Sequence, residues 1–249
     1  MADLPLSGRT AAITGAASGI GRALALKAAA EGMALALADT DAAGLAATAA
    51  AIRAAGAEAN TATLDVRDPA ALARFAAQAS GSIALVFANA GIARRRPVST
   101  QSLDELRLIL EVNVLGAIAT AQAFLPRLQA QAEPSRIAIT GSQASLVTFD
   151  GIGAYTASKH ALLPLAEALA AELAEMPVGV SLIVPGGVAT AILGRGVASS
   201  SPSVISAEAA ADIIFAGVRR GDFLISTHAD LPGRFDARCA ALRNGLGGD

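Results

Sequence analysis

Short apolar segments alternate with longer alanine-rich segments along the whole chain. Most of the short segments are apolar throughout, which is typical of strands in a parallel sheet that helices cover on both faces. The predicted strands are Thr10–Thr14, Met33–Ala38, Ala57–Leu64, Ile83–Ala88, Arg136–Thr140, Val178–Val184 and Phe223–Thr227. The predicted helices are Gly19–Glu31, Ala42–Ala55, Pro69–Ala79, Leu103–Ala130, Gly153–Met176 and Ala207–Arg219. This alternation predicts an α/β fold with right-handed crossovers, in which a seven-stranded, mostly parallel, doubly wound sheet is flanked by helices.

The chain has the size and composition of one large domain. Its 249 residues are 53% hydrophobic, which is enough for a sizeable core. No segment rich in proline, serine or charge divides it, so we expect a single domain over residues 1–249. Glycines, a serine run and Pro202 make Leu193–Ser206 the one irregular stretch, and we expect a mobile loop there that covers the substrate, within about residues 188–206.

Composition excludes several classes of protein. No run of about 18 apolar residues lacks a polar break, so we expect no membrane span. The first residues have neither the basic nor the apolar region of a secretory signal, and the lone Cys239 cannot form an internal disulfide, so a cytoplasmic protein is expected. A net charge of −2 argues against a nucleic-acid surface. We also expect no metal site.

A glycine-rich turn follows the first predicted strand. Thr10–Thr14 runs into Gly15-Ala16-Ala17-Ser18-Gly19-Ile20-Gly21 and then directly into a helix. Glycines at such a turn permit close approach of a pyrophosphate, and the helix N-terminus behind them offers free N–H groups. The glycine spacing alone is a weak signal because the chain has 24 glycines, but the strand–turn–helix context predicts a dinucleotide site.

Asp39 ends the second predicted strand, 18 residues after Gly21. A carboxylate at this place can accept hydrogen bonds from an adenosine ribose and would repel a 2′-phosphate. The sequence therefore predicts NAD as the cofactor and makes NADP less favoured. The alternative is that Asp39 only opens the turn before the next helix.

The single tyrosine of the chain, Tyr155, lies four residues before Lys159, one of two lysines. At this spacing both side chains project from one face of a helix. A free phenol is a poor acid–base catalyst at neutral pH, and a nearby ammonium favours the phenolate and lowers the phenol pKa. An ordinary surface pair is the alternative, but the rarity of both residue types favours a catalytic pair.

Two further polar residues complete a candidate catalytic set. Ser142 follows the strand Arg136–Thr140, and its hydroxyl could hold a carbonyl oxygen beside the phenol. Ser145 is a competitor for that role. Asn113 lies in the middle of a predicted helix, where asparagine is unfavourable, so either a buried role or a plain solvent-facing position is open.

The residues from about Thr10 to Thr190 resemble the short-chain dehydrogenase/reductase family, in its shorter single-domain branch. The resemblance rests on several motifs in the family's order, namely Thr14-Gly15-x-x-x-Gly19-x-Gly21, Asp65-Val66, Asn89-Ala90-Gly91, Asn113, Ser142, Tyr155-x-x-x-Lys159 and Pro185-Gly186. It implies a Rossmann-like sheet and hydride transfer between a nicotinamide cofactor and a secondary alcohol or ketone.

The resemblance also implies residue roles. Tyr155 would be the acid/base, Lys159 would lower its pKa and bind the nicotinamide ribose, Ser142 would position the substrate oxygen, and Asn113 would hold a water in a proton relay. The expected cofactor-binding residues are Gly15, Ser18, Gly19, Ile20, Gly21, Asp39, Asp65, Val66, Asn89, Gly91, Tyr155, Lys159, Pro185, Gly186, Val188 and Thr190.

The C-terminal segment 221–249 departs from the family's commonest ending. It contains a helix-like stretch, Arg234–Arg243, in place of the glycine-rich turn that helps tetramers assemble. The helices Leu103–Ala130 and Gly153–Met176 resemble the family's dimer surface, so we expect a homodimer or a homotetramer.

Few residues bear on the substrate. Its expected apolar walls are Ala93, Leu146, Val147, Phe149, Ile192 and Leu193. The run Arg94-Arg95-Arg96 either selects an acidic substrate or is an ordinary solvated face, which is the commoner case. His228 could reach the cleft, although a structural or surface histidine is commoner.

Three other functions stay open beside an NAD-dependent alcohol dehydrogenase or carbonyl reductase. They are an NADP-linked reductase of keto or acyl substrates, an enzyme of epimerisation or elimination, and a dinucleotide-binding protein without catalysis. Asp39 argues against the first of them. The intact set of Asn113, Ser142, Tyr155 and Lys159 argues against the last.

Overall fold

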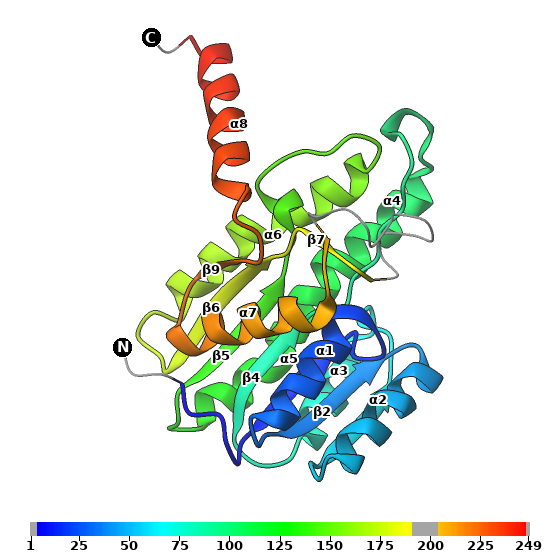
Figure 1. The fold of residues 1–249 in the computed structure, drawn as a ribbon, viewed down its shortest axis with the longest axis vertical. Helices are drawn as coiled ribbons and strands as arrows, with labels where there is room; N and C mark the ends of the chain where they lie inside the picture. The colour runs from blue at the N-terminus through cyan, green and yellow to red at the C-terminus, as the bar shows by residue number, and fades with distance from the viewer. Residues whose placement is uncertain (1–3, 191–203, 248–249) are drawn as a thin grey trace.

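A seven-stranded parallel sheet forms the centre of the computed structural model, which describes residues 4–190 and 204–247 (Figure 1). Its strand order is β3-β2-β1-β4-β5-β6-β9, and every neighbouring pair is parallel. The strands are β1 (Thr10–Thr14), β2 (Ala34–Asp39), β3 (Ala59–Thr63), β4 (Ile83–Ala88), β5 (Ser135–Thr140), β6 (Val178–Val184) and β9 (Leu224–Ser226). The predicted doubly wound α/β fold is confirmed.

Helices cover both faces of this sheet. The helices are α1 (Gly19–Ala30), α2 (Ala42–Ala54), α3 (Pro69–Gln78), α4 (Leu103–Leu110), α5 (Gly116–Ala130), α6 (Gly153–Glu172), α7 (Ala207–Arg220) and α8 (Leu231–Gly245). Side chains of α1, α2 and α7 share one apolar core with the sheet, and side chains of α3, α5 and α6 share the other. Strands with a core on each face explain why most of the strand sequences lack polar alternation.

The predicted helix Leu103–Ala130 is interrupted. A π-helical segment at Glu111–Leu115 separates α4 from α5. One extra residue in such a turn rotates the following helix relative to the preceding one, and π segments are frequent at functional sites. The sequence predicted one uniform helix because apolar residues recur throughout the stretch and neither glycine nor proline interrupts it between Leu103 and Leu115.

Short elements also appear where none were predicted. Gly187–Val188 (β7) pairs in parallel with Val204–Ile205 (β8), so the end of the predicted loop Leu193–Ser206 is a strand. The rest of that loop, up to residue 203, lies outside the described residues. The 3-10 turns Val98–Thr100 (η1) and Gln143–Ser145 (η3) were also missed.

Helix α8 extends away from the sheet at the end opposite the amino ends of β4 and β5 (Figure 1). The helix-like stretch expected at Arg234–Arg243 is therefore a helix that begins three residues earlier and ends two residues later. Of its residues, only Leu231 is buried. Its first turn reaches the body of the protein, and the rest projects from it.

One helical stretch among the described residues, Leu103–Ala130, is long and apolar enough by length and composition to cross a membrane. A helix packed on a sheet passes the same test, and its Ala117, Ala121 and Phe124 are buried in the core. The stretch therefore gives no independent indication of a membrane span.

Phe87 on the central strand β4 should carry a large share of the packing energy. It is fully buried, and its ring centroid lies 5.7 Å from that of Phe215 on α7. Phe87→Ala should lower the free energy of unfolding by about 3–5 kcal/mol, measured by urea denaturation, because it leaves a cavity between sheet and helix. Phe235→Ala on α8, where the side chain is 38% exposed, is the matched control and should cost less than about 1 kcal/mol. Equal costs would contradict this account of the core.

Candidate active site

A cleft of about 1020 Å³ lies along the carboxyl ends of β1, β2, β4, β5 and β6. Ligands of open α/β sheets bind at this edge, where the strand order reverses. The cleft is lined by every residue that was expected to bind the cofactor and by all of the expected catalytic residues except Asn113. The placement agrees with the predicted site, and the role of each residue stays a prediction.

The turn between β1 and α1 requires its glycines. Gly15 has a φ of +70°, and a Cβ there would lie 2.9 Å from the Cα of Ala90. A Cβ on Gly21 would lie 2.0 Å from the carbonyl oxygen of Gly15. The turn therefore packs tightly against the segment after β4. This packing places the backbone of the turn at the cleft.

The N-terminus of α1 fits an anionic ligand. Ser18 is its N-cap residue but makes no side-chain capping bond, and the first turn contains no acidic residue. Ser18, Gly19 and Ile20 all line the cleft. Uncapped helix N–H groups with the positive end of the helix dipole suit a pyrophosphate, so the residues present fit a dinucleotide.

The Asp39 carboxylate is held in place at the end of β2. Its Oδ2 accepts a hydrogen bond from the Ala17 N–H at 2.9 Å, and its Oδ1 accepts one from the Asp41 N–H at 3.0 Å. Asp39 also lines the cleft. The two alternatives considered for it are therefore compatible, since one carboxylate shapes the turn and faces the space where a ribose would lie.

Asp65 follows β3 and forms an ion pair that was not predicted from the sequence. Its Oδ2 lies 2.6 Å from Nη2 of Arg67, and this pairing lowers the pKa of the Asp65 carboxyl. Arg67 also lines the cleft and lies 3.5 Å from a carboxylate oxygen of Glu111. The close spacing of Asp65 and Arg67 after a strand end was the sequence signal that could have predicted this ion pair.

Asn89 joins the ends of three strands. Its Nδ2 donates to the carbonyl of Thr14 at 3.1 Å, and its Oδ1 accepts from the hydroxyl of Thr140 at 3.2 Å. The Thr14 hydroxyl in turn accepts from the Asn89 N–H at 3.1 Å. The asparagine therefore fixes the floor of the cleft, a role that the neighbouring Ala88 does not share because it is buried in the core.

Tyr155 and Lys159 project from one face of α6 as predicted. Lys159 is 3% exposed, and its ammonium donates to the carbonyl of Thr140 at 2.7 Å and lies 5.8 Å from the centroid of the Tyr155 ring. Burial lowers the pKa of Lys159 to about 8. Burial also raises the pKa of the Tyr155 phenol, and a hydrogen bond with the Ser142 side chain opposes that rise.

The structure distinguishes the two candidate serines. Ser142 lines the cleft, and its Oγ accepts a hydrogen bond from the Ala144 N–H at 3.1 Å. Ser145 is buried, and its Oγ accepts from the Ser142 N–H at 3.2 Å. Ser145 therefore supports the turn η3 that presents Ser142, which favours Ser142 for contact with substrate.

Asn113 is fully buried in the π-helical segment and does not line the cleft. Its Oδ1 accepts from the Ile92 N–H at 2.8 Å, while its Nδ2 donates to the Ile92 carbonyl at 2.9 Å and to the Ser158 hydroxyl at 3.0 Å. The Ser158 hydroxyl donates to the Tyr155 carbonyl at 2.6 Å. These contacts make Asn113 a positioning residue that ties the segment after β4 to α6, and its water-holding role stays a prediction.

Several expectations about the substrate end of the cleft change. Ala93 and Phe149 line the cleft as expected, but Leu146 and Val147 are buried in the core because the turn η3 directs them toward the sheet. Ile192 and Leu193 lie outside the described residues. Arg94 and Arg95 line the cleft, whereas Arg96 lies 3.4 Å from a carboxylate oxygen of Glu105.

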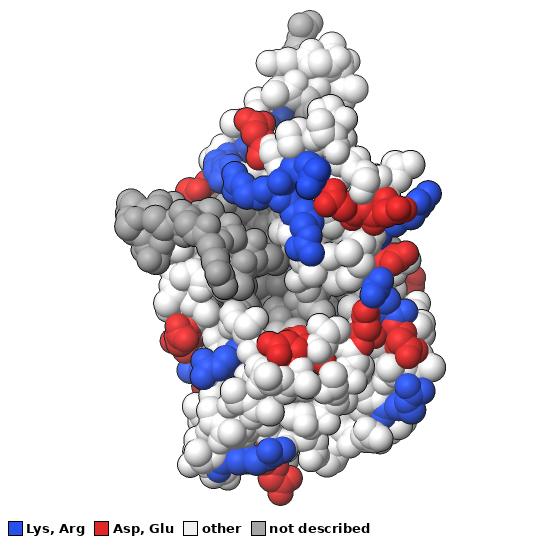
Figure 2. Space-filling model, turned by 90° about the vertical axis from the view of Figure 1, so that its right-hand side faces the viewer, with Lys and Arg blue, Asp and Glu red and all other residues white. Residues whose placement is uncertain are grey.

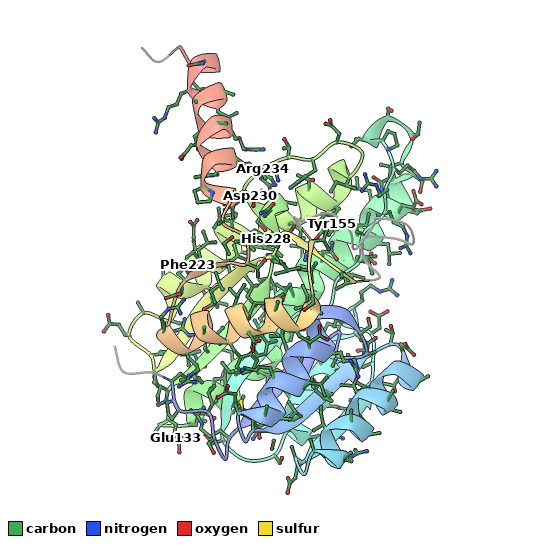
Figure 3. The ribbon with its side chains drawn as sticks, in the orientation of Figure 1. Glu133, Tyr155, Phe223, His228, Asp230 and Arg234 are labelled. Carbon is green, nitrogen blue, oxygen red and sulfur yellow. The ribbon has the colours of Figure 1, made fainter. Side chains whose placement is uncertain are left out.

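The C-terminal segment contributes to the cleft more than its sequence indicated. His228, Asp230 and Arg234 all line it (Figure 3). The Gly186 N–H lies 3.2 Å from Nδ1 of His228, so the imidazole supports the backbone after β6. His228 was one of the residues expected to be able to reach the cleft, whereas no local motif pointed to Asp230 and Arg234, because contacts with distant parts of the chain place them.

Lys159 gives a prediction for the dependence of stability on pH. Its pKa of about 8 in the folded protein lies below the 10.5 of a free lysine, so between these values the unfolded chain binds more protons and stability rises with pH. From pH 7.5 to 9.5 the free energy of unfolding should rise by about 2 kcal/mol more for the wild type than for Lys159→Met. Urea denaturation at both pH values measures this.

Lys27→Met is the matched control, because Lys27 is the only other lysine and lies 3.3 Å from Glu31 and 2.9 Å from Asp212. These carboxylates raise the pKa of Lys27, so its substitution should leave the pH dependence unchanged. The same slope in Lys159→Met and wild type would contradict the burial of a titrating ammonium.

Curated proteins similar to this chain are oxidoreductases. A 1-deoxy-11-beta-hydroxypentalenate dehydrogenase from Streptomyces avermitilis is 36% identical over 230 residues, which are 89% of this chain and 85% of the relative. A 3-dehydrosphinganine reductase from Arabidopsis thaliana is 32% identical over 238 residues, which are 90% of this chain and 71% of the relative.

Several solved structures of similar fold contain nicotinamide dinucleotides. A short-chain dehydrogenase/reductase from Burkholderia phymatum in complex with NAD has a TM-score of 0.89 and 31% identity, covering 99% of this chain and 97% of that one. A short-chain dehydrogenase from Sphingobium yanoikuyae in complex with NADPH has a TM-score of 0.83 and 28% identity, covering 96% and 94%.

A family model described as short chain dehydrogenase matches residues 9–199, which include the glycine turn, the cleft-lining strand ends and the Tyr155–Lys159 pair. The family match, the relatives and the fold agree, and this chain belongs to the short-chain dehydrogenase/reductase family.

Proposed function

We propose that this oxidoreductase transfers a hydride between NAD(H) and a secondary alcohol or ketone, with Tyr155 as the acid/base. The observation that carries the proposal is the half-buried phenol with the Lys159 ammonium behind it and Ser142 beside it in one cleft. The names of the relatives are consistent with this reaction, because they pair a hydroxy compound with a dehydrogenase and a dehydro compound with a reductase.

The three side chains divide the proton chemistry between them. In alcohol oxidation the Tyr155 oxygen takes the proton of the substrate hydroxyl, and in ketone reduction it returns a proton to the same oxygen. Ser142 donates a hydrogen bond to that oxygen and holds it beside the phenol. The ammonium of Lys159 favours the phenolate and so opposes the effect of burial on the pKa of Tyr155.

The helix N-terminus at Ser18–Ile20 would bind the pyrophosphate, and Asp39 would accept hydrogen bonds from the adenosine ribose. When bound, the nicotinamide supplies the acceptor or donor of the hydride. Asp39 supports NAD over NADP because a carboxylate at this place would repel a 2′-phosphate.

Tyr155→Phe should lower the turnover of secondary alcohols by roughly 10²–10⁴-fold, because it removes the proton acceptor and keeps the ring. Initial rates of nicotinamide reduction with a panel of secondary alcohols measure this. The dissociation constant for NADH should stay unchanged in a titration of nicotinamide fluorescence, which the absence of tryptophan makes simple to measure. A variant that keeps most of the wild-type rate would overturn the assigned mechanism.

Asp39→Asn should shift the preference between cofactors toward NADPH by about tenfold, because it removes one negative charge while its amide oxygen still accepts a hydrogen bond in the turn. The ratio of dissociation constants for NADH and NADPH measures the shift. Asp41→Asn is the matched control, since Asp41 caps α2 two residues away and does not line the cleft. An unchanged ratio in Asp39→Asn would remove Asp39 from the ribose role.

A further inference from the structure

Besides Arg67, three of the described arginines line the cleft, and they come from two distant segments. Arg94 and Arg95 follow β4, and Arg234 lies near the start of α8. Lys and Arg side chains gather along the upper rim of the hollow in Figure 2, with acidic side chains directly beside them, and further acidic side chains lie below the hollow. Arg234, Asp230, His228 and Tyr155 lie toward the same end of the sheet in Figure 3.

Arg234 is held in a defined position. Its guanidinium carbon lies 4.4 Å from the centroid of the Phe149 ring, and its Nη1 donates to Oε1 of Gln143 at 3.2 Å. The Gln143 amide donates in turn to Oδ1 of Asp230 at 3.0 Å. A guanidinium has five N–H donors, so this arrangement orients the group and leaves donors for a ligand.

The same contacts place Arg234 at the substrate end of the cleft. Gln143, its hydrogen-bond partner, directly follows Ser142 in the chain, and Phe149 lies a few residues further on. Both residues line the cleft. The guanidinium is therefore close to the turn that presents Ser142, and far along the cleft from Asp39 at the end of β2.

Positive charge exceeds negative charge at this end. Of the described acidic residues that line the cleft, Asp39 lies at the end of β2, Asp65 is paired with Arg67, and Asp230 lies near Arg234. Asp230 lies 3.9 Å from Arg234 and accepts a hydrogen bond from Gln143. Within the described part of the chain, Arg94 and Arg95 form no ion pair, whereas the adjacent Arg96 pairs with Glu105.

Apolar side chains share this end of the cleft with the arginines. Ile92, Ala93, Phe149 and Ile152 line it and are half-buried. An apolar wall with a guanidinium at its edge suits a molecule that is apolar over most of its surface and carries one anionic group. A carboxylate fits this description because it pairs with a planar guanidinium through two parallel hydrogen bonds.

We infer that Arg234, with Arg94 and Arg95, binds the carboxylate of an apolar hydroxy acid or keto acid whose reacting oxygen lies at Ser142 and Tyr155. This inference deepens the proposed function and rests on it, since it specifies the substrate class of the same cleft. The apolar body of this acid lies along the apolar wall of the cleft, between its carboxylate at the arginines and its reacting oxygen at Ser142 and Tyr155.

A series of alicyclic hydroxy acids and their methyl esters tests the inference, with increasing separation between hydroxyl and carboxylate. For at least one acid of the series, kcat/KM should exceed that of its ester by about tenfold or more. Arg234→Gln should abolish this preference by raising KM for the acid, with little change in kcat/KM for the ester. Arg95→Gln should reduce the preference for the acid. Arg96→Gln is the matched control and should keep the wild-type preference, because Arg96 does not line the cleft.

Ligand binding without turnover gives a second measurement. Cyclohexanecarboxylate should raise the Tm of the wild type and of Arg96→Gln, but not that of Arg234→Gln, and cyclohexanecarboxamide should raise none. Three results would each overturn the inference. They are an equal kcat/KM for acids and esters, a loss of the preference for acids in Arg96→Gln as large as in Arg234→Gln, and a preference for a phosphate monoester over the carboxylate. Tyr155-dependent turnover of neutral alcohols without preference for acids would overturn it and leave the proposed function intact. The absence of any turnover, with carboxylate binding retained, would overturn the proposed function and with it the hydroxy acid or keto acid substrate, and would leave only a carboxylate-binding site.

Discussion

The parallel direction of all seven strands is the constraint on which the site depends. Because the strands run the same way, their carboxyl ends meet at one edge, where the backbone must turn into the next helix. Asp39, Asn89 and Ser142 come from three such turns, and the side chain of Asn89 joins the ends of β1, β4 and β5. The side chains expected to bind cofactor and substrate therefore converge at this edge because of the strand direction, and no separate element is needed to bring them together.

Lys159 shows what this arrangement costs. The structure buries its ammonium, and no carboxylate among the described residues lies within ion-pair distance of it, so its main partner is the Thr140 carbonyl at 2.7 Å. Burying a charge that is only hydrogen-bonded to a neutral group destabilises the fold. This loss of stability is consistent with a functional role for Lys159. A positive charge beside Tyr155 has its largest effect on the phenol pKa where water is excluded.

Local patterns predicted the part of the site that consists of strand ends and one helix face. The glycines after Thr10–Thr14, Asp39 at a strand end, and the spacing of Tyr155 and Lys159 each depend on a few neighbouring residues. The predicted residues that the structure directs elsewhere, Leu146 and Val147, directly follow the turn η3, whose direction is determined by packing on the sheet. The π-helical segment around Asn113 was not predictable from periodicity, because one inserted residue leaves the apolar pattern nearly unchanged.

The sequence alone determined the α/β class, the order of strands and helices, and the family, because these follow from periodicity and from motifs of a few adjacent residues. Only the tertiary structure decided what lines the substrate end of the cleft. Gln143 meets Asp230 and Arg234 across 87 and 91 residues, and the guanidinium stacks on Phe149. No local pattern encodes such contacts, since they depend on where α8 begins after the last strand and which turn it meets.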